Sequence, residues 1–255
     1  MIEFLDADYK RYYGKNNQYK KYVLNWFGPD SEKNYLDTCE KNPNWIYKDV
    51  KITYELNYCF FRTDNFDEID WNNSILMLGC SFVFGIGLTN ESTMPYRLQE
   101  LTGHKVINLG MPAASNTRIW SLLINILNSK IKPKAIIIVW SDPNRYTEFN
   151  NDGMEDFQPG TGHLKEKSEL AYYYLTHETQ SVEMSLRYII SSKIMCSDIP
   201  YFAYSWYPNS MLDKQVTPFA NTAIERDRAR DNSHYGPYCN NFWANQIYND
   251  IRGII

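Results

Sequence analysis

The sequence lacks paired cysteines, an excess of positive charge and any long apolar run. Its five cysteines are scattered and never stand in a CxxC spacing, which argues against a disulfide framework and a zinc site and favours a reducing compartment. The formal net charge is −4 and the pI is about 5.6. Because such a chain offers no basic surface to neutralise phosphates, nucleic acid is excluded as an expected partner.

Membrane and secretory signals are also missing. The longest apolar runs, such as residues 135–140, are far shorter than the roughly 18 residues that a spanning helix needs. Residues 1–8 carry acidic side chains where a signal peptide has a basic start and an apolar centre. We therefore expect a cytoplasmic protein without a membrane span.

The length and composition indicate a globular chain with one main domain. Its 255 residues are 44% hydrophobic and 22% charged, which excludes disorder of the whole chain. Residues 1–73 are rich in Tyr, Asn and Lys and show no sustained helical stripe, so we expect them to be an elaboration packed on the core. Residues 74–255 form the expected main domain.

Short apolar strands alternate with helices in this main domain. Such alternation predicts parallel strands with right-handed crossovers, and hence a three-layer α/β/α sandwich with a mostly parallel, flavodoxin-like sheet. Ligands bind beyond the carboxyl ends of the strands in such sheets. The expected strands are residues 75–78, 105–109, 135–140 and 201–206. The first expected helix covers residues 92–102, and the second is capped by Ser115 or Asn116. The third covers most of residues 168–196, and a C-terminal helix is marked by Trp243, Ile247 and Ile251.

A serine follows the first of these strands, in the turn Gly79-Cys80-Ser81. A serine hydroxyl on a tight strand-to-helix turn is exposed and close to backbone N–H groups. A nucleophile needs both when negative charge develops on the attacked carbonyl. An ordinary glycine-rich turn capped by serine has the same pattern, and for this motif taken alone the structural interpretation is favoured.

A histidine preceded by an aspartate lies near the other end of the chain, as Asp231 and His234. Imidazole is the side chain best suited to accept a serine proton near neutral pH, and an acid three residues earlier can hold its ring in the required tautomer. For this pair taken alone, a loop histidine beside a turn-forming aspartate is an equally good interpretation.

In this order and in this scaffold, the two motifs resemble those of the SGNH/GDSL hydrolases, and the resemblance spans roughly residues 74–251. It implies Ser81 as the nucleophile, Asp231 and His234 as the other members of a catalytic triad, and no metal or other cofactor. Pro237, close behind the histidine, is also similar to the family. Cys80 departs from it, because the family has an aspartate at that position.

The resemblance also implies an oxyanion hole, whose members are matched less directly. The N–H of Ser81 is one donor, and the family's oxyanion glycine falls at Ala113, which still offers a backbone N–H. The family's third block, Gly-x-Asn-Asp, is present only in altered form at residues 140–145, where a shift of one residue makes Asn144 the amide donor. Asn116 is a second candidate for that donor, with helix capping as its alternative role.

Other polar groups have plainer interpretations. Cys80 could be the nucleophile in place of Ser81, but adjacent residues of a turn point in different directions. No metal-ligand spacing relates the three other histidines, His104, His163 and His177. A solvated loop is expected to contain the carboxylates of Glu148, Asp152, Glu155 and Asp156. Three arginines either hold an anionic group or pair with acids, namely Arg226, Arg228 and Arg230.

The sequence thus predicts a serine ester hydrolase of the SGNH/GDSL type that cleaves a small acyl or O-acetyl ester, on a carbohydrate or another small molecule. An acyltransferase shares the acyl-serine intermediate and is not separated from a hydrolase by sequence. The alternative is a non-catalytic binding or structural module on the same scaffold, indicated by Cys80, Ala113 and the altered third block. Retention of all three triad residues speaks against that alternative. No sequence feature indicates the oligomeric state.

Overall fold

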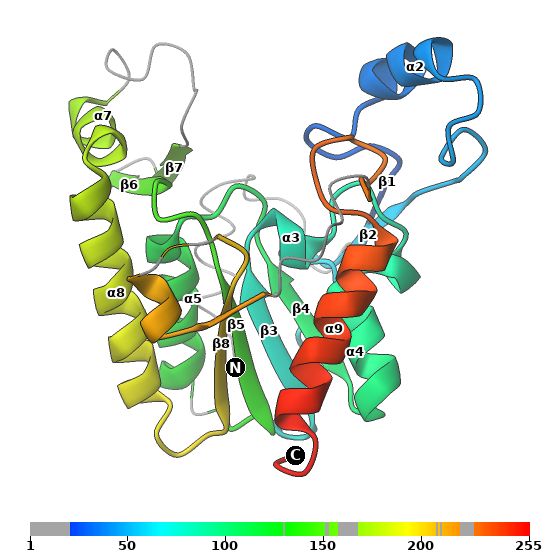
Figure 1. Ribbon diagram of the computed structural model, residues 1–255. Coiled ribbons are helices and arrows are strands. Elements are labelled where there is room, and N and C mark those ends of the chain that lie inside the picture. Colours follow the sequence, from blue (N-terminus) through cyan, green and yellow to red (C-terminus); the bar gives the residue numbers. More distant parts are fainter. Residues whose placement is uncertain are drawn as a thin grey trace.

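The computed structural model describes residues 21–129, 131–150, 153–157, 168–207, 209, 211–219 and 227–255. Its centre is a five-stranded sheet in the order β4-β3-β5-β8-β9, in which every neighbouring pair is parallel. Helices cover both faces of this sheet (Figure 1). The fold is therefore the expected three-layer α/β/α sandwich with a flavodoxin-like strand order. The strands are β3 (Ile75–Gly79), β4 (Val106–Gly110), β5 (Ala135–Trp140), β8 (Tyr201–Ser205) and β9 (Thr217–Pro218).

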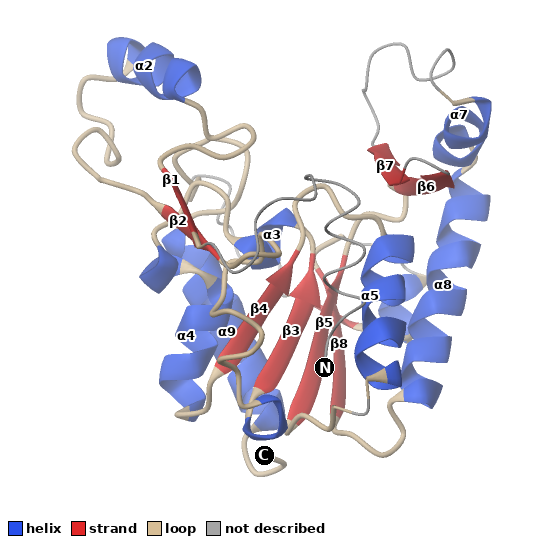
Figure 2. Cartoon of the chain, turned by 180° about the vertical axis from the view of Figure 1, so that it is seen from behind, coloured by secondary structure: helices blue, strands red, loops and turns tan. Residues whose placement is uncertain are grey.

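The apolar strands divide their side chains between the two helical layers. On β3, Met77 packs in one buried cluster with Trp243, while Leu76 packs in another with Ile119. Because side chains alternate along a strand, a strand covered on both faces is apolar throughout. Figure 1 and, from behind, Figure 2 show α4 and α9 on one face of the sheet and α5 and α8 on the other. These helices are α4 (Met94–Thr102), α5 (Asn116–Asn128), α8 (Glu178–Met195) and α9 (Pro237–Ile251).

Side-chain caps decide where two of these helices begin. The hydroxyl of Thr93 accepts the N–H of Tyr96, so α4 begins two residues later than predicted, after the 3-10 turn η2 (Asn90–Ser92). The hydroxyl of Ser115 accepts the N–H of Arg118 and caps α5. Of the two predicted caps, Ser115 is therefore the correct one.

The region between β5 and α8 contains structure that the sequence prediction missed. Strands β6 (Tyr146–Asn150) and β7 (Gly153–Phe157) pair antiparallel, where a loop was expected. The helix expected over most of residues 168–196 is interrupted at His177, which separates α7 (Glu169–Thr176) from α8.

The described N-terminal segment, residues 21–73, also contains regular structure. Strands β1 (Tyr22–Leu24) and β2 (Tyr54–Leu56) pair antiparallel, and helix α2 (Glu32–Lys41) lies between them in the chain. Every residue of α2 is at least partly exposed. The 3-10 turns η1 (Trp71–Asn73) and η3 (Leu212–Lys214) complete the described elements.

A third apolar cluster joins the N-terminal segment to the main domain. Tyr54 and Leu56 of β2 pack there with Phe84 and Ile86, which follow Ser81 closely in the chain. Tyr54 is also among the largest fully buried side chains. The segment thus shares a core with the turn that carries the predicted nucleophile.

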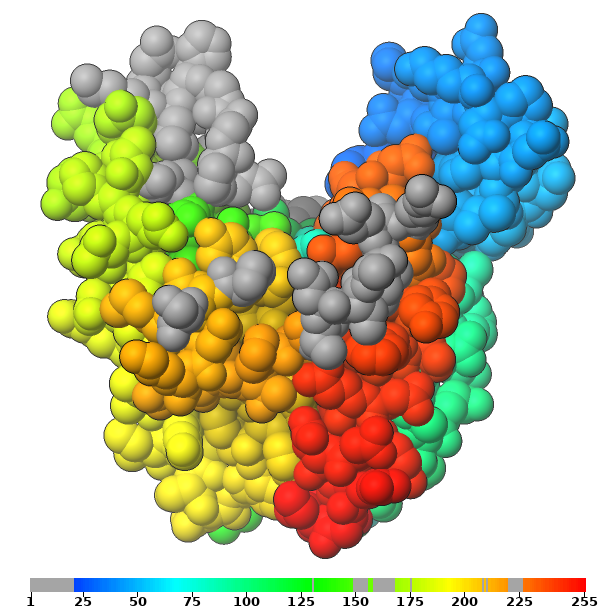
Figure 3. Space-filling view, viewed as in Figure 1, coloured from blue at the N-terminus to red at the C-terminus, as the bar shows by residue number. Residues whose placement is uncertain are grey.

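The molecule is hollowed between two projections, one containing α2 and the other containing α7 (Figure 3). The short helix α3 (Ser81–Phe84), which follows β3, lies between these projections in Figure 1. The carboxyl end of β3 therefore faces the hollow, as expected for a ligand site of a parallel sheet. Within the described ranges, no helix is both long and apolar enough to cross a membrane.

Candidate active site

Ser81 is held at the carboxyl end of β3 by a tight turn. A Cβ added to Gly79 would lie 2.4 Å from a methyl carbon of Val83. A Cβ added to Gly110, at the same level of the neighbouring strand, would lie 2.3 Å from the amide nitrogen of Phe84. Only glycine allows helix α3 to lie this close to both strands, and Ser81 is the first residue of that helix.

Ser81, His234 and Asp231 form one chain of hydrogen bonds. The Oγ of Ser81 lies 2.8 Å from Nε2 of His234, and Nδ1 of His234 lies 2.5 Å from Oδ2 of Asp231. An ionised carboxylate can only accept, so Nδ1 carries the proton and Nε2 is left to accept the proton of Ser81. The structure thus brings together the three residues that the sequence predicts for a catalytic triad.

Asp231 organises its own loop through both carboxylate oxygens. Oδ1 accepts the backbone N–H groups of Ser233, at 3.2 Å, and His234, at 3.0 Å. Burial alone would raise the pKa of Asp231, but the hydrogen bonds and the attraction from His234 outweigh it, so this pKa lies below its usual value. Asp231 therefore remains ionised near neutral pH and can orient the imidazole.

Three partly exposed aromatic side chains flank His234. The ring of Phe82 lies 5.1 Å from the imidazole, 4.5 Å from the ring of Trp206 and 5.4 Å from that of Tyr235, between centroids. Such a surface can pack against an acyl chain or the face of a sugar ring. The sequence did not single out these residues, because aromatic side chains occur throughout the chain and most belong to the core.

Cys80 packs into the sheet and does not face the imidazole. It is fully buried in the apolar cluster that also contains Leu78 and Ile107, whereas its neighbour Ser81 reaches His234. A thiol enclosed by apolar side chains is not accessible to a substrate. The geometry therefore favours Ser81 over Cys80 as the nucleophile.

Ala113 has the backbone conformation of a glycine. Its φ is +63°, in the left-handed region, and it lies in a turn where the N–H of Ala114 donates to the carbonyl of Met111 at 3.1 Å. This region costs a residue with a Cβ about 1–2 kcal/mol, and glycine is the default there. The position at which the resemblance implies an oxyanion glycine is thus one where the backbone itself favours glycine.

Asn116 joins three elements through its side-chain amide. Nδ2 donates to the carbonyl of Ser141, at 3.1 Å, and to the hydroxyl of Ser185, at 2.9 Å, while Oδ1 accepts the N–H of Ser141 at 2.8 Å. Both amide hydrogens are therefore engaged in tying α5 to the end of β5 and to α8. This geometry favours a structural role for Asn116 over the oxyanion role. The expected capping role is wrong, because Ser115 is the cap.

Asn144 lies in the loop that follows β5. Its backbone N–H donates to Oδ1 of Asp142 at 2.8 Å, and its side-chain Oδ1 accepts the hydroxyl proton of Ser181 at 2.9 Å. The hydroxyl of Ser181 has a second acceptor in the carbonyl of Glu178 at 2.8 Å, and the side chain of Asn144 also hydrogen-bonds with Asp142 and Tyr207. Asn144 stays the predicted amide donor of the oxyanion hole.

The carboxylates predicted for a solvated loop are placed differently. Asp156, on β7, forms an ion pair with Arg118 of α5 and accepts the hydroxyl proton of Thr147 at 2.6 Å. Glu148, on β6, lies opposite position 155 on β7. The expectation of a solvated loop is therefore wrong for Asp156, while Asp152 and the side chain of Glu155 lie outside the described residues.

The histidines and arginines outside the triad have other neighbours. The ring of His177 stacks on Tyr173 with 4.0 Å between centroids, and His104 is partly exposed. The guanidinium of Arg228 lies 5.3 Å from the ring centroid of Tyr235. Arg230 forms an ion pair with Asp30, and His163 and Arg226 lie outside the described residues. Over the described ranges, no group of three or more His, Cys, Asp or Glu side chains could hold a metal ion.

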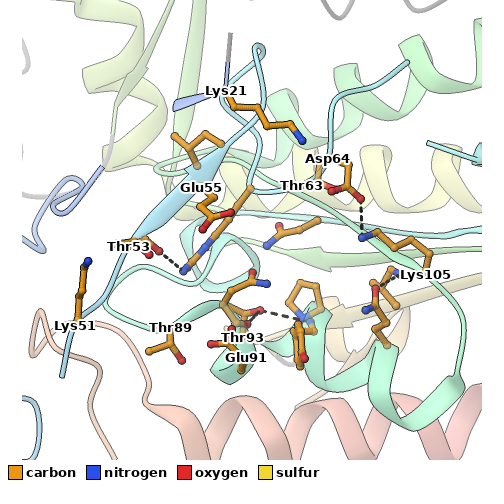
Figure 4. A pocket seen from close by; sticks show the side chains of 18 residues that line it. Lys21, Lys51, Thr53, Glu55, Thr63, Asp64, Thr89, Glu91, Thr93 and Lys105 are labelled. Carbon is orange, nitrogen blue, oxygen red and sulfur yellow. Dashed lines mark hydrogen bonds and ion pairs between the residues drawn. The ribbon is translucent and has the colours of Figure 1, made fainter. Parts of the chain in front are cut away.

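A separate polar pocket of about 450 Å³ lies between the N-terminal segment and α4 (Figure 4). Its charged groups are largely engaged with the protein. Lys105 pairs with Asp64 at 2.7 Å, and Arg62 donates to the carbonyls of Gly85, at 2.7 Å, and Leu88, at 2.8 Å. The described residues that line this pocket do not include the triad, so the pocket is not the site of triad chemistry.

No family model and no curated protein matches the chain. Solved structures do match it. A protein from Desulfitobacterium hafniense, described as lipolytic and of the G-D-S-L family, is 13% identical, with 70% of this chain and 99% of that chain covered and a TM-score of 0.42. An acetyl xylan esterase from the rumen bacterium Butyrivibrio proteoclasticus is 12% identical, with 71% of this chain and 63% of that chain covered and a TM-score of 0.47.

The catalytic domain of peptidoglycan O-acetyltransferase A from Streptococcus pneumoniae is also similar, at 14% identity and a TM-score of 0.33, with 72% of this chain and 94% of that domain covered. Because the identities are low and the TM-scores lie below 0.5, no substrate and no residue role is transferred from these proteins.

Proposed function

We propose that the chain is a serine acyl hydrolase of the SGNH type. In this proposal Ser81 is the nucleophile, His234 is the general base and Asp231 orients the imidazole. The observation that carries the proposal is the chain of hydrogen bonds from Ser81 through His234 to Asp231, with distances of 2.8 and 2.5 Å. Its place at the carboxyl end of β3, where ligands bind in parallel sheets, supports it further.

The first half of the proposed reaction acylates the serine. His234 takes the hydroxyl proton at Nε2 while Oγ of Ser81 bonds to the ester carbonyl carbon. The carbonyl oxygen becomes an oxyanion, for which the N–H groups of Ser81 and Ala113 and the amide of Asn144 are the proposed donors. His234 then gives its proton to the departing alkoxide, the C–O bond breaks, and an alcohol and the acyl-serine remain.

The second half releases the acyl group. His234 takes a proton from water, the oxygen of that water attacks the acyl-serine, and the proton returns to Oγ of Ser81 as the acid leaves. If the hydroxyl of an acceptor alcohol replaces water, the same steps give an acyltransferase. Each oxyanion donor contributes about 2.7–4 kcal/mol of transition-state stabilisation in comparable sites.

For the substrate we propose a small acyl or O-acetyl ester of a carbohydrate or another small molecule. The partly exposed rings of Phe82, Trp206 and Tyr235 support this, because they form an aromatic cluster next to the imidazole of His234, on which an acyl chain or a sugar ring can pack.

For the location we propose the cytoplasm. All five cysteines are free thiols, which suits the reducing conditions of that compartment.

Hydrolysis of short-chain nitrophenyl esters tests the proposal without knowledge of the natural substrate. We expect the wild type to turn over the acetyl ester and the Ser81→Ala variant to fall to the uncatalysed rate. Thermal unfolding of both proteins controls for folding. A folded wild type that is no faster than Ser81→Ala on any short-chain ester would favour the non-catalytic binding module.

A further inference from the structure

A buried ion pair connects the N-terminal segment to the loop that carries Asp231 and His234. The guanidinium of Arg230 meets the carboxylate of Asp30 in two parallel hydrogen bonds, from Nε to Oδ1 at 2.8 Å and from Nη2 to Oδ2 at 2.7 Å. The side chains are only 4% and 1% exposed. Arg230 directly precedes Asp231, so this pair fixes the residue next to the triad aspartate.

The surroundings of Arg230 fit a guanidinium specifically. Its Nη2 also donates to the carbonyl of Asn25 at 2.9 Å. The central carbon of the guanidinium lies 4.3 Å from the ring centroid of Trp26 and 5.7 Å from that of Tyr35. A planar, forked cation can satisfy a carboxylate and stack on aromatic rings at once, which the point charge of a lysine cannot do.

The ion pair belongs to a network that also reaches the nucleophile's turn. The hydroxyl of Tyr54 donates to Asp30 and accepts the N–H of Gly87 at 2.8 Å. The backbone N–H of Arg230 donates to the carbonyl of Gly87 at 3.0 Å. Gly87 follows Ser81 closely in the chain and binds both the hydroxyl of Tyr54 and the backbone of Arg230.

The backbone of Gly87 lies close against the backbone of Arg230 and Asp231. A Cβ added to Gly87 would lie 3.0 Å from the backbone nitrogens of both Arg230 and Asp231. The N-terminal segment also holds the loop from two further residues, Tyr47, whose hydroxyl donates to the carbonyl of Arg228 at 3.0 Å, and Thr38, whose Oγ1 accepts from Asn232 at 3.1 Å.

We propose that Asp30 and Arg230 are positioning residues that set Asp231 and His234 at their distance from Ser81. The attraction between two buried charges roughly offsets the cost of removing them from water, so such a pair adds little to the free energy of unfolding. It can instead hold the two segments that carry it in one arrangement. The N-terminal segment is then a working part of the active site and not an accessory. The expected effect on the reaction rate of Ser81 rests on the proposed function. The expected effect on the positions of Asp231 and His234 does not.

The test separates positioning from stability by removing both charges at once. Asp30→Asn leaves Arg230 unpaired and destabilises the protein. The double variant Asp30→Asn/Arg230→Met carries no unpaired charge and recovers much of the thermal stability. Asp64→Asn is the control for removing a carboxylate from the N-terminal segment, because it breaks an ion pair with Lys105 that lies away from the triad, with side chains 46% and 47% exposed.

The first readout is the rate at which a fluorophosphonate labels Ser81, resolved into binding and inactivation constants. For the folded double variant we expect the inactivation rate constant to fall on the order of a hundredfold, with the binding constant unchanged, because small misplacements of catalytic groups have effects of that size. Asp64→Asn keeps the wild-type rate. A double variant that regains both stability and the wild-type rate overturns the proposal.

The second readout is the proton NMR signal of the Nδ1–H of His234, which lies far downfield in a short hydrogen bond to a carboxylate and is assigned by its loss in His234→Ala. We expect it in the wild type and in Asp64→Asn, and we expect it shifted or lost in the double variant. A wild type that the fluorophosphonate does not label would refute the proposed function. The NMR signal would still show whether Asp30 and Arg230 position His234. If the double variant does not fold, Arg230→Lys replaces it, and an unchanged signal in that variant overturns the proposal.

Discussion

The Nε2 of His234 lies 2.8 Å from the Oγ of Ser81, although 153 positions separate the two residues in the chain. Asp231 completes the relationship by accepting the other ring proton at 2.5 Å and two backbone N–H groups of its own loop. The carboxylate of Asp231 therefore orients the imidazole at Nδ1, and the opposite ring nitrogen, Nε2, faces the hydroxyl of Ser81.

Asp231→Asn should nearly abolish acylation while leaving the fold intact. An asparagine can present its NH₂ group to Nδ1 and so favour the imidazole tautomer whose Nε2 carries the proton and cannot accept one from Ser81. In a comparable triad such a change lowers the rate by about 10⁴-fold. The measurement is single-turnover acylation by a nitrophenyl ester, and a loss smaller than tenfold would contradict the role assigned to Asp231.

The same aspartate should make stability depend on acid pH. The pKa of Asp231 is lower in the folded chain than its usual value of 3.8, so between these two values the unfolded state binds more protons. The stability that ionised Asp231 contributes is present above about pH 4 and is lost as the pH falls through the folded pKa. Urea unfolding of the wild type and Asp231→Asn from pH 3 to pH 7 should show a stability difference that shrinks toward acid. A constant difference would refute this account.

Asn144 and Asn116 should respond differently to removal of their amides. We expect Asn144→Ala to lower the rate by about 10²–10³-fold with little change in stability, as for the loss of one oxyanion donor. Asn116→Ala should lower stability, because it leaves the buried N–H of Ser141 without its acceptor, at about 1–3 kcal/mol. Esterase rates and denaturation midpoints of the two variants check this. The reverse pattern would make Asn116 the oxyanion donor.

Thiol reactivity should distinguish Cys80 from a nucleophile. Cys39 is partly exposed and the other four cysteines are buried, and burial raises the pKa of both Cys196 and Cys239 to about 12. We expect one thiol to react quickly with a disulfide reagent in the native protein and five in denaturant. Peptide mapping identifies the fast site as Cys39. Rapid modification at Cys80 would instead indicate an accessible thiol beside Ser81.

The sheet was predictable because its strands are covered on both faces. Each central strand must then be apolar at every position, and residues 135–140 were predicted with the same bounds that the structure has. β6 and β7 escaped prediction because their apolar residues do not alternate. In β6, for example, the two aromatic residues are Tyr146 and Phe149, so no period of two is visible.

The motif of Ser81 was predictable because it stands between a strand and a helix, and the motif of Asp231 and His234 because it precedes the C-terminal helix in the order that the resemblance implies. The Asp30–Arg230 contact was not, since 200 positions separate the two residues and neither lies in a periodic pattern. The conformation of Ala113 was equally hidden, because an alanine gives no sign of a positive φ. Long-range polar contacts and backbone strain are set by tertiary packing, which a local pattern does not report.

Intact-mass spectrometry after fluorophosphonate treatment of the wild type, Ser81→Ala and His234→Ala shows whether His234 activates Ser81 as a nucleophile. We expect a single adduct on the wild type, located at Ser81 by peptide mapping, and none on either variant. A folded wild type without an adduct, or an adduct that persists in Ser81→Ala, would contradict this expectation.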